Sequence, residues 1–305
     1  MTRTSFQTTS ERGLDRESLP MRLYEKAKRL GIWNPSDLDF AHDARTWQTY
    51  DHERREATLQ ITSLFQAGEE GVTLDLLPLI ECVASEGRLE EELFLTTFLW
   101  EEGKHVDFFR RFLDEVCEEH GDLHRFHTPS YRRIFYEELP SALERLREDR
   151  SPEAQVNAAV TYNMIVEGVL AETGYHSYFR AMEAGNEMPG LLAGLAHVKR
   201  DESRHIAYGV YLLTRLIGER PDLWELAEAR MTELLEPASA FIAETFEGYE
   251  DGISPFGLRL DEIAGFSFSQ FQKRLDRIRR GTRAATVREA EALAEEELAE
   301  ASPAA

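Results

Sequence analysis

One pattern of glutamate and histidine occurs twice in this chain, and it restricts the fold more than any other feature of the sequence. Each copy has a single glutamate followed, 33 or 35 residues later, by a Glu-x-x-His motif. The six residues are Glu69, Glu102 and His105 in the first copy and Glu167, Glu202 and His205 in the second. Residues i and i+3 of an α-helix share a face, so each motif directs a carboxylate and an imidazole toward one point.

This set of residues is typical of a two-metal site inside a four-helix bundle, in which two helices each supply a Glu and two others each supply a Glu-x-x-His. A helix rises about 1.5 Å per residue, so either interval lets the chain pass the site, turn and return to the same level. We therefore expect two helical hairpins that face each other across a pair of metal ions.

A glutamate three residues before a histidine can also arise by chance on a solvated helix face. Of the nine histidines, however, only His105 and His205 have Glu at this position. Both also follow an acidic residue by four positions, Glu101 and Asp201 respectively. Metal-bound imidazoles usually donate their second N–H to a carboxylate or a carbonyl. We therefore expect Glu101 and Asp201 to hold the ligand histidines from outside the metal site.

Apolar residues recur at helical spacing through most of the chain, and no alternating strand pattern is present. We predict an all-α fold with residues 1–46 as an N-terminal arm that contains one short helix near 23–29. The predicted longer helices cover 51–85, 89–120, 134–148, 152–184, 189–217, 222–247 and 260–279. Residues 283–305 are predicted to form a weakly ordered acidic tail.

Length and composition favour one domain over residues 1–305, because no linker rich in Pro, Gly or Ser divides the chain and the two motif copies must meet. No apolar run reaches the 18 or so residues that span a bilayer, and the N-terminus lacks the apolar stretch of a signal peptide. We therefore expect a cytoplasmic protein without an integral membrane segment. Its cysteines, Cys82 and Cys117, are expected to be free core thiols. A net charge of −22 argues against a nucleic-acid partner.

The donor set restricts the metal and its chemistry. One imidazole and several carboxylates per ion suit iron or manganese better than zinc, which favours more nitrogen and sulfur. Four carboxylates balance the charge of two divalent ions, so the reduced site would be neutral in a dry interior. Such a site suits reactions with O2. Ferritins, desaturases, hydroxylases and radical generators all share this ligand pattern, so the pattern alone does not choose among them.

Residues 19–280 resemble the ribonucleotide-reductase-small-subunit-like ligand-binding oxidases, a branch of the ferritin-like superfamily. Four segments carry the resemblance: 67–72 (AGEEGV), 100–105 (WEEGKH), 162–168 (YNMIVEG) and 201–205 (DESRH). The resemblance implies a ferritin-like four-helix bundle with additional helices, a homodimer and a manganese/iron pair. It places manganese toward Glu69, Glu102 and His105, and iron toward Glu167, Glu202 and His205. A di-iron loading stays open, because both metals accept these ligands.

The resemblance also implies a reaction. Its members bind a long-chain fatty acid whose carboxylate meets the metals, and they use O2 to form an ether bond between the β-carbon of a valine and a tyrosine oxygen. The matching positions here are Val72 and Tyr162, each within about a turn and a half of a ligand glutamate. We therefore predict an oxidoreductase that performs a two-electron oxidation of an unactivated C–H bond. Apolar residues such as Phe65, Phe98, Val169 and Leu170 are candidates to line its tunnel, and most of the four are expected to be ordinary core residues.

Two other functions stay open. The first is the small subunit of a manganese/iron ribonucleotide reductase. The usual radical tyrosine would lie four residues after His105, where this chain has Phe109, which disfavours the tyrosyl-radical type alone. The second is a non-catalytic carrier in which the metals anchor a fatty acid and consume no O2. Val72 with Tyr162 favours the oxidase, although Gly71, where the family more often has Ala, puts the yield of the cross-link in doubt.

Overall fold

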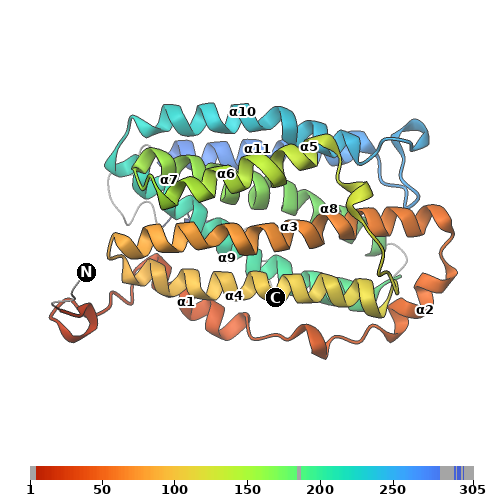
Figure 1. The fold of residues 1–305 in the computed structure, drawn as a ribbon, viewed down its shortest axis with the longest axis horizontal. Helices are drawn as coiled ribbons and strands as arrows, with labels where there is room; N and C mark the ends of the chain where they lie inside the picture. The colour runs from red at the N-terminus through yellow and green to blue at the C-terminus, as the bar shows by residue number, and fades with distance from the viewer. Residues whose placement is uncertain (1–4, 184–186, 282–291, 293, 297, 299–305) are drawn as a thin grey trace.

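The computed structural model describes residues 5–183, 187–281, 292, 294–296 and 298. The regular elements of this part of the chain are helical, apart from one isolated β-bridge between Ile253 and Arg259 (Figure 1). The predicted all-α fold is confirmed. None of the described helices combines the length and the apolar character needed to cross a membrane.

The N-terminal arm contains more helix than the sequence predicted. Helix α1 (Leu19–Leu30) is longer than the expected 23–29, and α2 (Ala41–Thr49) was not expected at all. Short 3₁₀ turns precede each of them, at Gln7–Thr9 and Pro35–Asp37. Leu19, Leu23 and Ala27 are buried and place α1 against the long helices α4 (Leu89–Glu115) and α9 (Pro189–Glu219). Their spacing of four residues puts them on one face of α1, which is why the arm packs on the bundle.

Four long helical segments form the bundle that carries the motifs. The first two are α3 (His52–Ser85) and α4 (Leu89–Glu115), which pack along each other. The third is continuous over α7 (Pro152–Ala159), η6 (Val160–Ala171) and α8 (Glu172–Glu183), and the fourth is α9 (Pro189–Glu219). The backbone is left-handed at Glu118 (φ 50°), so α4 ends before the predicted residue 120.

The third segment is not the uniform α-helix that the sequence predicted. Its middle part, η6, is a π-helix, in which each N–H bonds to the carbonyl five residues back. Residues five positions apart therefore lie near one face, and Tyr162 and Glu167 have this spacing. The π-helix thus brings a candidate cross-link residue and a candidate ligand to the same side of the bundle. Such segments are rare and frequently occur at functional sites.

The remaining helices cover the bundle on the side of η6. The predicted helix 134–148 begins earlier, at Pro129, and consists of a π-helical turn among shorter pieces: α5 (Pro129–Arg132), η4 (Arg133–Glu138), α6 (Leu139–Glu144) and η5 (Arg145–Arg147). Short 3₁₀ turns lie at His124–Phe126 and Glu250–Gly252. Helices α10 (Leu223–Glu244) and α11 (Leu260–Gly281) pack on η6, on the opposite side of the molecule from α1 (Figure 1).

The predicted weak order of the tail, residues 283–305, falls mostly outside the described residues. Two tail positions that the structure describes, Ala294 and Leu298, are buried. Both cysteines, Cys82 and Cys117, are buried free thiols, as the sequence predicted.

Candidate metal centre

The six motif residues meet at one buried place, although they come from four segments of the chain. Helix α3 supplies Glu69, α4 supplies Glu102 and His105, η6 supplies Glu167, and α9 supplies Glu202 and His205. Their ligand atoms form two groups, each within 4.8 Å: Glu69, Glu102, His105 and Glu202, and Glu102, Glu167, Glu202 and His205. Glu102 and Glu202 belong to both groups. Two ions bound here would therefore share these two carboxylates and would not each have three separate ligands.

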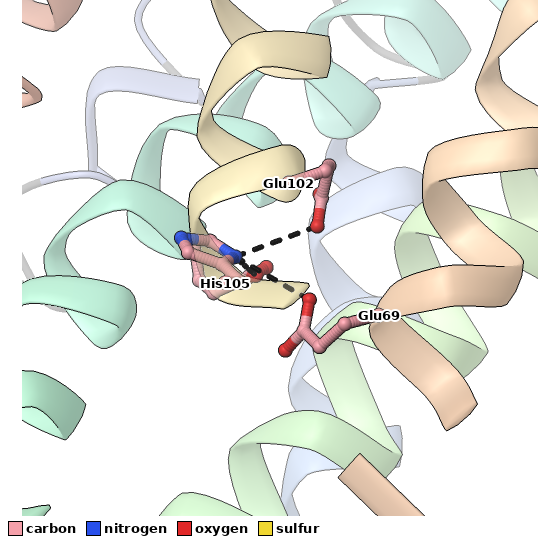
Figure 2. Close-up of side chains that lie close together, drawn as sticks. Glu69, Glu102 and His105 are labelled. Carbon is pink, nitrogen blue, oxygen red and sulfur yellow. Dashed lines mark ion pairs between the residues drawn. The ribbon is translucent and has the colours of Figure 1, made fainter. Parts of the chain in front are cut away.

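The Nδ1 atom of each histidine faces the carboxylates. Nδ1 of His105 lies 3.4 Å from an oxygen of Glu69 and 3.4 Å from one of Glu102 (Figure 2), and 3.3 Å from Glu202. The Nδ1 atom of His205 lies 3.1 Å from Glu102 and 3.5 Å from Glu202. Glu167 is the most distant member of the second group, 3.9 Å from this nitrogen. Each imidazole therefore presents Nδ1 as the ligand atom.

The donor atoms fit a pair of cations. Nδ1 of both histidines and one oxygen each of Glu102, Glu167 and Glu202 are buried without a hydrogen-bond partner among the described residues. A buried polar atom left without a partner costs about 1–3 kcal/mol. Five such atoms at one point indicate that the cluster is built to bind positive charge. Two divalent ions would satisfy these atoms and neutralise the four carboxylates.

The pKa shifts of the cluster residues also indicate a site that favours positive charge. Burial raises the pKa of Glu69 to about 8, although the neighbouring His105 opposes the rise. Burial would lower the pKa of His105, but the surrounding carboxylates, Glu69 first, raise it well above its usual range. The pKa of His205 is raised in the same way, with Glu202 as the strongest contributor against burial. The carboxylates thus favour positive charge on both imidazoles, for the same reason that they would favour a bound metal cation.

Glu101 and Asp201 lie beside the outer nitrogens of the histidines, each from across the bundle: Nε2 of His205 is hydrogen-bonded to Glu101, whereas Nε2 of His105 has no hydrogen-bond partner among the described residues. Nε2 of His205 lies 2.9 Å from Glu101, and Nε2 of His105 lies 3.5 Å from Asp201. All four side chains are fully buried. An imidazole that turns Nδ1 to the metals directs Nε2 away from its own helix, so the carboxylate comes from the facing helix. This cross-pairing was not predicted.

Three residues that the sequence analysis did not single out fix these carboxylates. The buried guanidinium of Arg204 donates to both Glu101 and Asp201. Nε1 of Trp33 donates to Asp201 over 2.7 Å, and Nζ of Lys104 donates to it over 3.0 Å. Lys104 and Arg204 each directly precede a motif histidine, so the sequence could have identified these two residues. Trp33 lies in a loop 168 residues from Asp201, and nothing in the sequence indicated this contact.

The two candidate cross-link residues lie beside the ligands. The hydroxyl of Tyr162 donates to Oε1 of Glu102 over 3.4 Å. The Tyr162 ring stacks on Phe98, which in turn stacks on His205 with 3.6 Å between ring centroids. Val72 is buried one turn after Glu69 on α3. Tyr162 thus contacts Glu102, and Val72 lines the same cavity as Glu69.

An apolar cavity of about 150 Å³ adjoins the cluster. Its polar end includes Glu69, Glu102, Glu167 and Glu202. Apolar side chains from α3, η6, α10 and the turn after α10 line much of the remainder, among them Phe65, Val72, Leu170, Phe241 and Phe246. Two of the four tunnel residues expected from the sequence, Phe65 and Leu170, line this cavity, whereas Phe98 and Val169 are core residues. The cluster therefore opens into a space suited to an apolar molecule.

Comparisons with known proteins agree with this site. The family model for the small chain of ribonucleotide reductase matches residues 21–267. The chain is also similar to solved structures of R2-like ligand-binding oxidases. One is a Y162F mutant with an aerobically reconstituted Mn/Fe cofactor, 39% identical, with a TM-score of 0.85, covering 90% of this chain and 98% of that chain.

Two further structures show the same similarity. A V72L mutant with an anaerobically reconstituted Mn/Fe cofactor is 40% identical, and a G68L mutant with a non-activated Mn/Mn cofactor is 39% identical. Each has a TM-score of 0.85 and covers 90% of this chain and 98% of its own. The all-α bundle described above is thus the ferritin-like fold of these proteins. The chain belongs to the ribonucleotide reductase small chain family and, within it, to the R2-like ligand-binding oxidases.

Proposed function

We propose that this protein is an O2-activating oxidase with a dinuclear manganese/iron centre, and that it oxidises an unactivated C–H bond by two electrons. The observation that carries the proposal is the pair of ligand groups that share Glu102 and Glu202 at the end of an apolar cavity. The similar oxidases with Mn/Fe cofactors support the identity of the metals. We assign manganese to the group with His105 and iron to the group with His205.

Side chains of the protein would hold the metal ions and orient the imidazoles toward them. When bound, the metal pair would supply the activation of O2 that C–H oxidation requires. Glu102 and Glu202 would hold both ions, and the outer carboxylates would keep each imidazole in the tautomer that offers Nδ1. A ligand bound among the apolar walls of the cavity would displace water, which would strengthen the electrostatic interactions inside.

We further propose that Val72 and Tyr162 become joined by an ether bond. This bond forms from the Val72 Cβ–H and the Tyr162 O–H with loss of two hydrogens, and O2 accepts the two electrons and two protons. The hydroxyl of Tyr162 lies 3.4 Å from Glu102, so an acceptor for its proton is adjacent. The similar oxidases include variants named Y162F and V72L, and this chain has tyrosine and valine at those numbers, which supports the choice of residues.

The proposed ligand of the cavity is a long-chain fatty acid. Its carboxylate would lie at the metal end, beside Glu69 and Glu202, and its chain would lie among Phe65, Leu170 and Phe241. Carboxylate oxygens suit manganese and iron, and apolar walls suit an alkyl chain. The description of the similar proteins as ligand-binding oxidases supports a bound molecule.

We also propose a homodimer. Leu74 and Leu77 on α3 and Trp100 on the adjacent α4 are exposed, by 61%, 40% and 49% respectively. Exposed large apolar side chains on two neighbouring helices favour protein contact. Light scattering should give twice the chain mass for the native protein, and Leu74→Glu should shift it toward the monomer. A native mass equal to one chain would contradict the proposal.

Uptake of O2 tests the function. Metal-free protein loaded anaerobically with Mn(II) and Fe(II), then mixed with O2 in an electrode chamber, should consume O2 in proportion to its metal content. Glu202→Ala, which removes a carboxylate that belongs to both ligand groups, should bind less metal and consume correspondingly little O2. Full metal occupancy without O2 uptake would instead favour the non-catalytic carrier.

A radical generator is the second candidate, because one contact favours it. The indole of Trp33 donates to Asp201, which in turn contacts His105, so an oxidisable ring is linked to the metal centre. If this candidate is right, O2 uptake should leave Val72 and Tyr162 unlinked, and addition of a reductase large subunit should yield ribonucleotide reduction.

A further inference from the structure

The hydroxyl of Tyr175 makes no hydrogen bond to the residues that the structure describes. It lies on α8 with 0% of its surface exposed, and its ring stacks on Phe65 with 4.9 Å between centroids. Its hydroxyl is buried and has no hydrogen-bond partner among the residues that the structure describes. Tyr175 also lines the cavity that ends at Glu69 and Glu202. Burial of a polar group without a partner is costly, so a partner from outside the chain is indicated.

A neighbouring tyrosine shows the contrast. Tyr178 lies one turn further along α8, lines the same cavity and is also buried. Its ring lies 5.6 Å from that of Phe65, similar to the position of the Tyr175 ring. The Tyr178 hydroxyl, however, is hydrogen-bonded to the hydroxyl of Thr62 over 2.6 Å. Two tyrosines thus share one wall, and the hydroxyl of one is satisfied within the protein while that of the other is not.

The chemistry of the Tyr175 hydroxyl makes it a hydrogen-bond donor to a molecule bound in the cavity. Burial first, and then the charges of Glu202 and Glu69, raise its pKa well above the usual range, so the phenol keeps its proton. A ligand carboxylate has about four lone-pair sites, and metal binding leaves some of them free. Hydrogen bonds to a charged acceptor are the strong ones in a dry site.

We propose that the Tyr175 hydroxyl donates a hydrogen bond to the carboxylate of the ligand that binds at the metal end of the cavity. Tyr175 is then a positioning residue, which fixes the head group of the ligand at the metals and selects for an acid. This inference rests on the proposed function, because it takes a fatty acid as the occupant of the cavity. It adds a residue that the motif and the cross-link do not include.

Two variants with matched chemistry test the inference. Protein freed of lipid and loaded anaerobically with Mn(II) and Fe(II) is titrated with palmitate in a calorimeter. Tyr175→Phe should raise the Kd for palmitate by about 10-fold, the effect of one hydrogen bond to a charged group. Tyr178→Phe should leave the Kd unchanged, because its hydroxyl is already paired with Thr62.

Thermal unfolding of the metal-free variants distinguishes a ligand-binding role of the Tyr175 hydroxyl from a structural role. Tyr175→Phe removes a hydroxyl without a protein partner and should leave Tm equal or higher. Tyr178→Phe breaks the bond to Thr62 and should lower Tm. Equal palmitate Kd values for wild type and Tyr175→Phe, or a lower Tm for Tyr175→Phe, would overturn the role of Tyr175 alone. Failure of the wild type to bind palmitate would overturn the proposed ligand, and this role with it.

Discussion

Removing one outer carboxylate should weaken the metal site of the opposite helix. Glu101 lies on α4, the helix of His105, but it contacts Nε2 of His205. We therefore expect Glu101→Gln to reduce metal affinity in the group with His205 and to spare the group with His105. Asp201→Asn should do the reverse. A pairing within each helix would give the opposite assignment.

The structure also ranks the two effects. Loss of a carboxylate behind a ligand histidine typically costs 10–100-fold in metal affinity, which is about 1.4–2.8 kcal/mol. Glu101 lies 2.9 Å from its histidine, whereas Asp201 lies 3.5 Å from its own and is also held by Trp33 and Lys104. We expect about 100-fold for Glu101→Gln and about 10-fold for Asp201→Asn.

The assay is metal occupancy resolved by site. Each variant is loaded with Mn(II) and Fe(II), exposed to a graded series of chelator, and crystallised for anomalous scattering at the two metal edges. Thermal unfolding of the metal-free variants serves as the control for a general loss of structure. Loss at the group with His105 in Glu101→Gln, or equal loss at both groups, would refute the cross-pairing.

Three further variants test the surroundings of the site through urea unfolding of the metal-free protein. Arg204→Met should lower the free energy of unfolding by about 3–5 kcal/mol, because the two buried carboxylates Glu101 and Asp201 lose their shared guanidinium. A decrease of less than about 1 kcal/mol would contradict this network. Asp75→Asn should stabilise the protein by about 1 kcal/mol at pH 7.5. Burial, followed by the charge of Glu144, raises the pKa of Asp75 to about 6, so the folded state holds its proton more tightly and loses stability as pH rises through this value. The gain should shrink as pH falls toward 4, and a gain independent of pH would exclude the mechanism. Gly71→Ala should add about 0.5–1 kcal/mol, because a β-carbon there meets nothing within 4 Å, and a loss of stability would show an unseen constraint.

The ligands and the helical class were predictable because both follow local rules. A Glu-x-x-His motif places two side chains on one face of any α-helix, so His105 and His205 could be found from spacing alone. The acids four residues before them were also visible, and in the structure each lies beside the histidine of the other motif. The sharing of Glu102 and Glu202 between two groups was not predictable, because it depends on how far apart the facing helices lie.

Features that depend on contacts between distant parts of the chain could not be predicted from the sequence. The π-helix η6 has the apolar composition of any buried helix, so nothing distinguished it from α-helix. The contact of Trp33 with Asp201 joins residues far apart in the chain, and α2 lacks a strong apolar stripe. The unpartnered hydroxyl of Tyr175 becomes evident only when the whole surrounding core is known.

The most direct test of the oxidase is tandem mass spectrometry of a protease digest. Metal-free protein is loaded anaerobically with Mn(II) and Fe(II), and one half is then exposed to air. We expect a fused peptide that joins Val72 to Tyr162, two hydrogens lighter than its parts, in the aerobic half alone. Tyr162→Phe is the control and should bind the metals without forming the fused peptide. Unlinked peptides from aerobic protein with full metal occupancy would contradict the proposed oxidation.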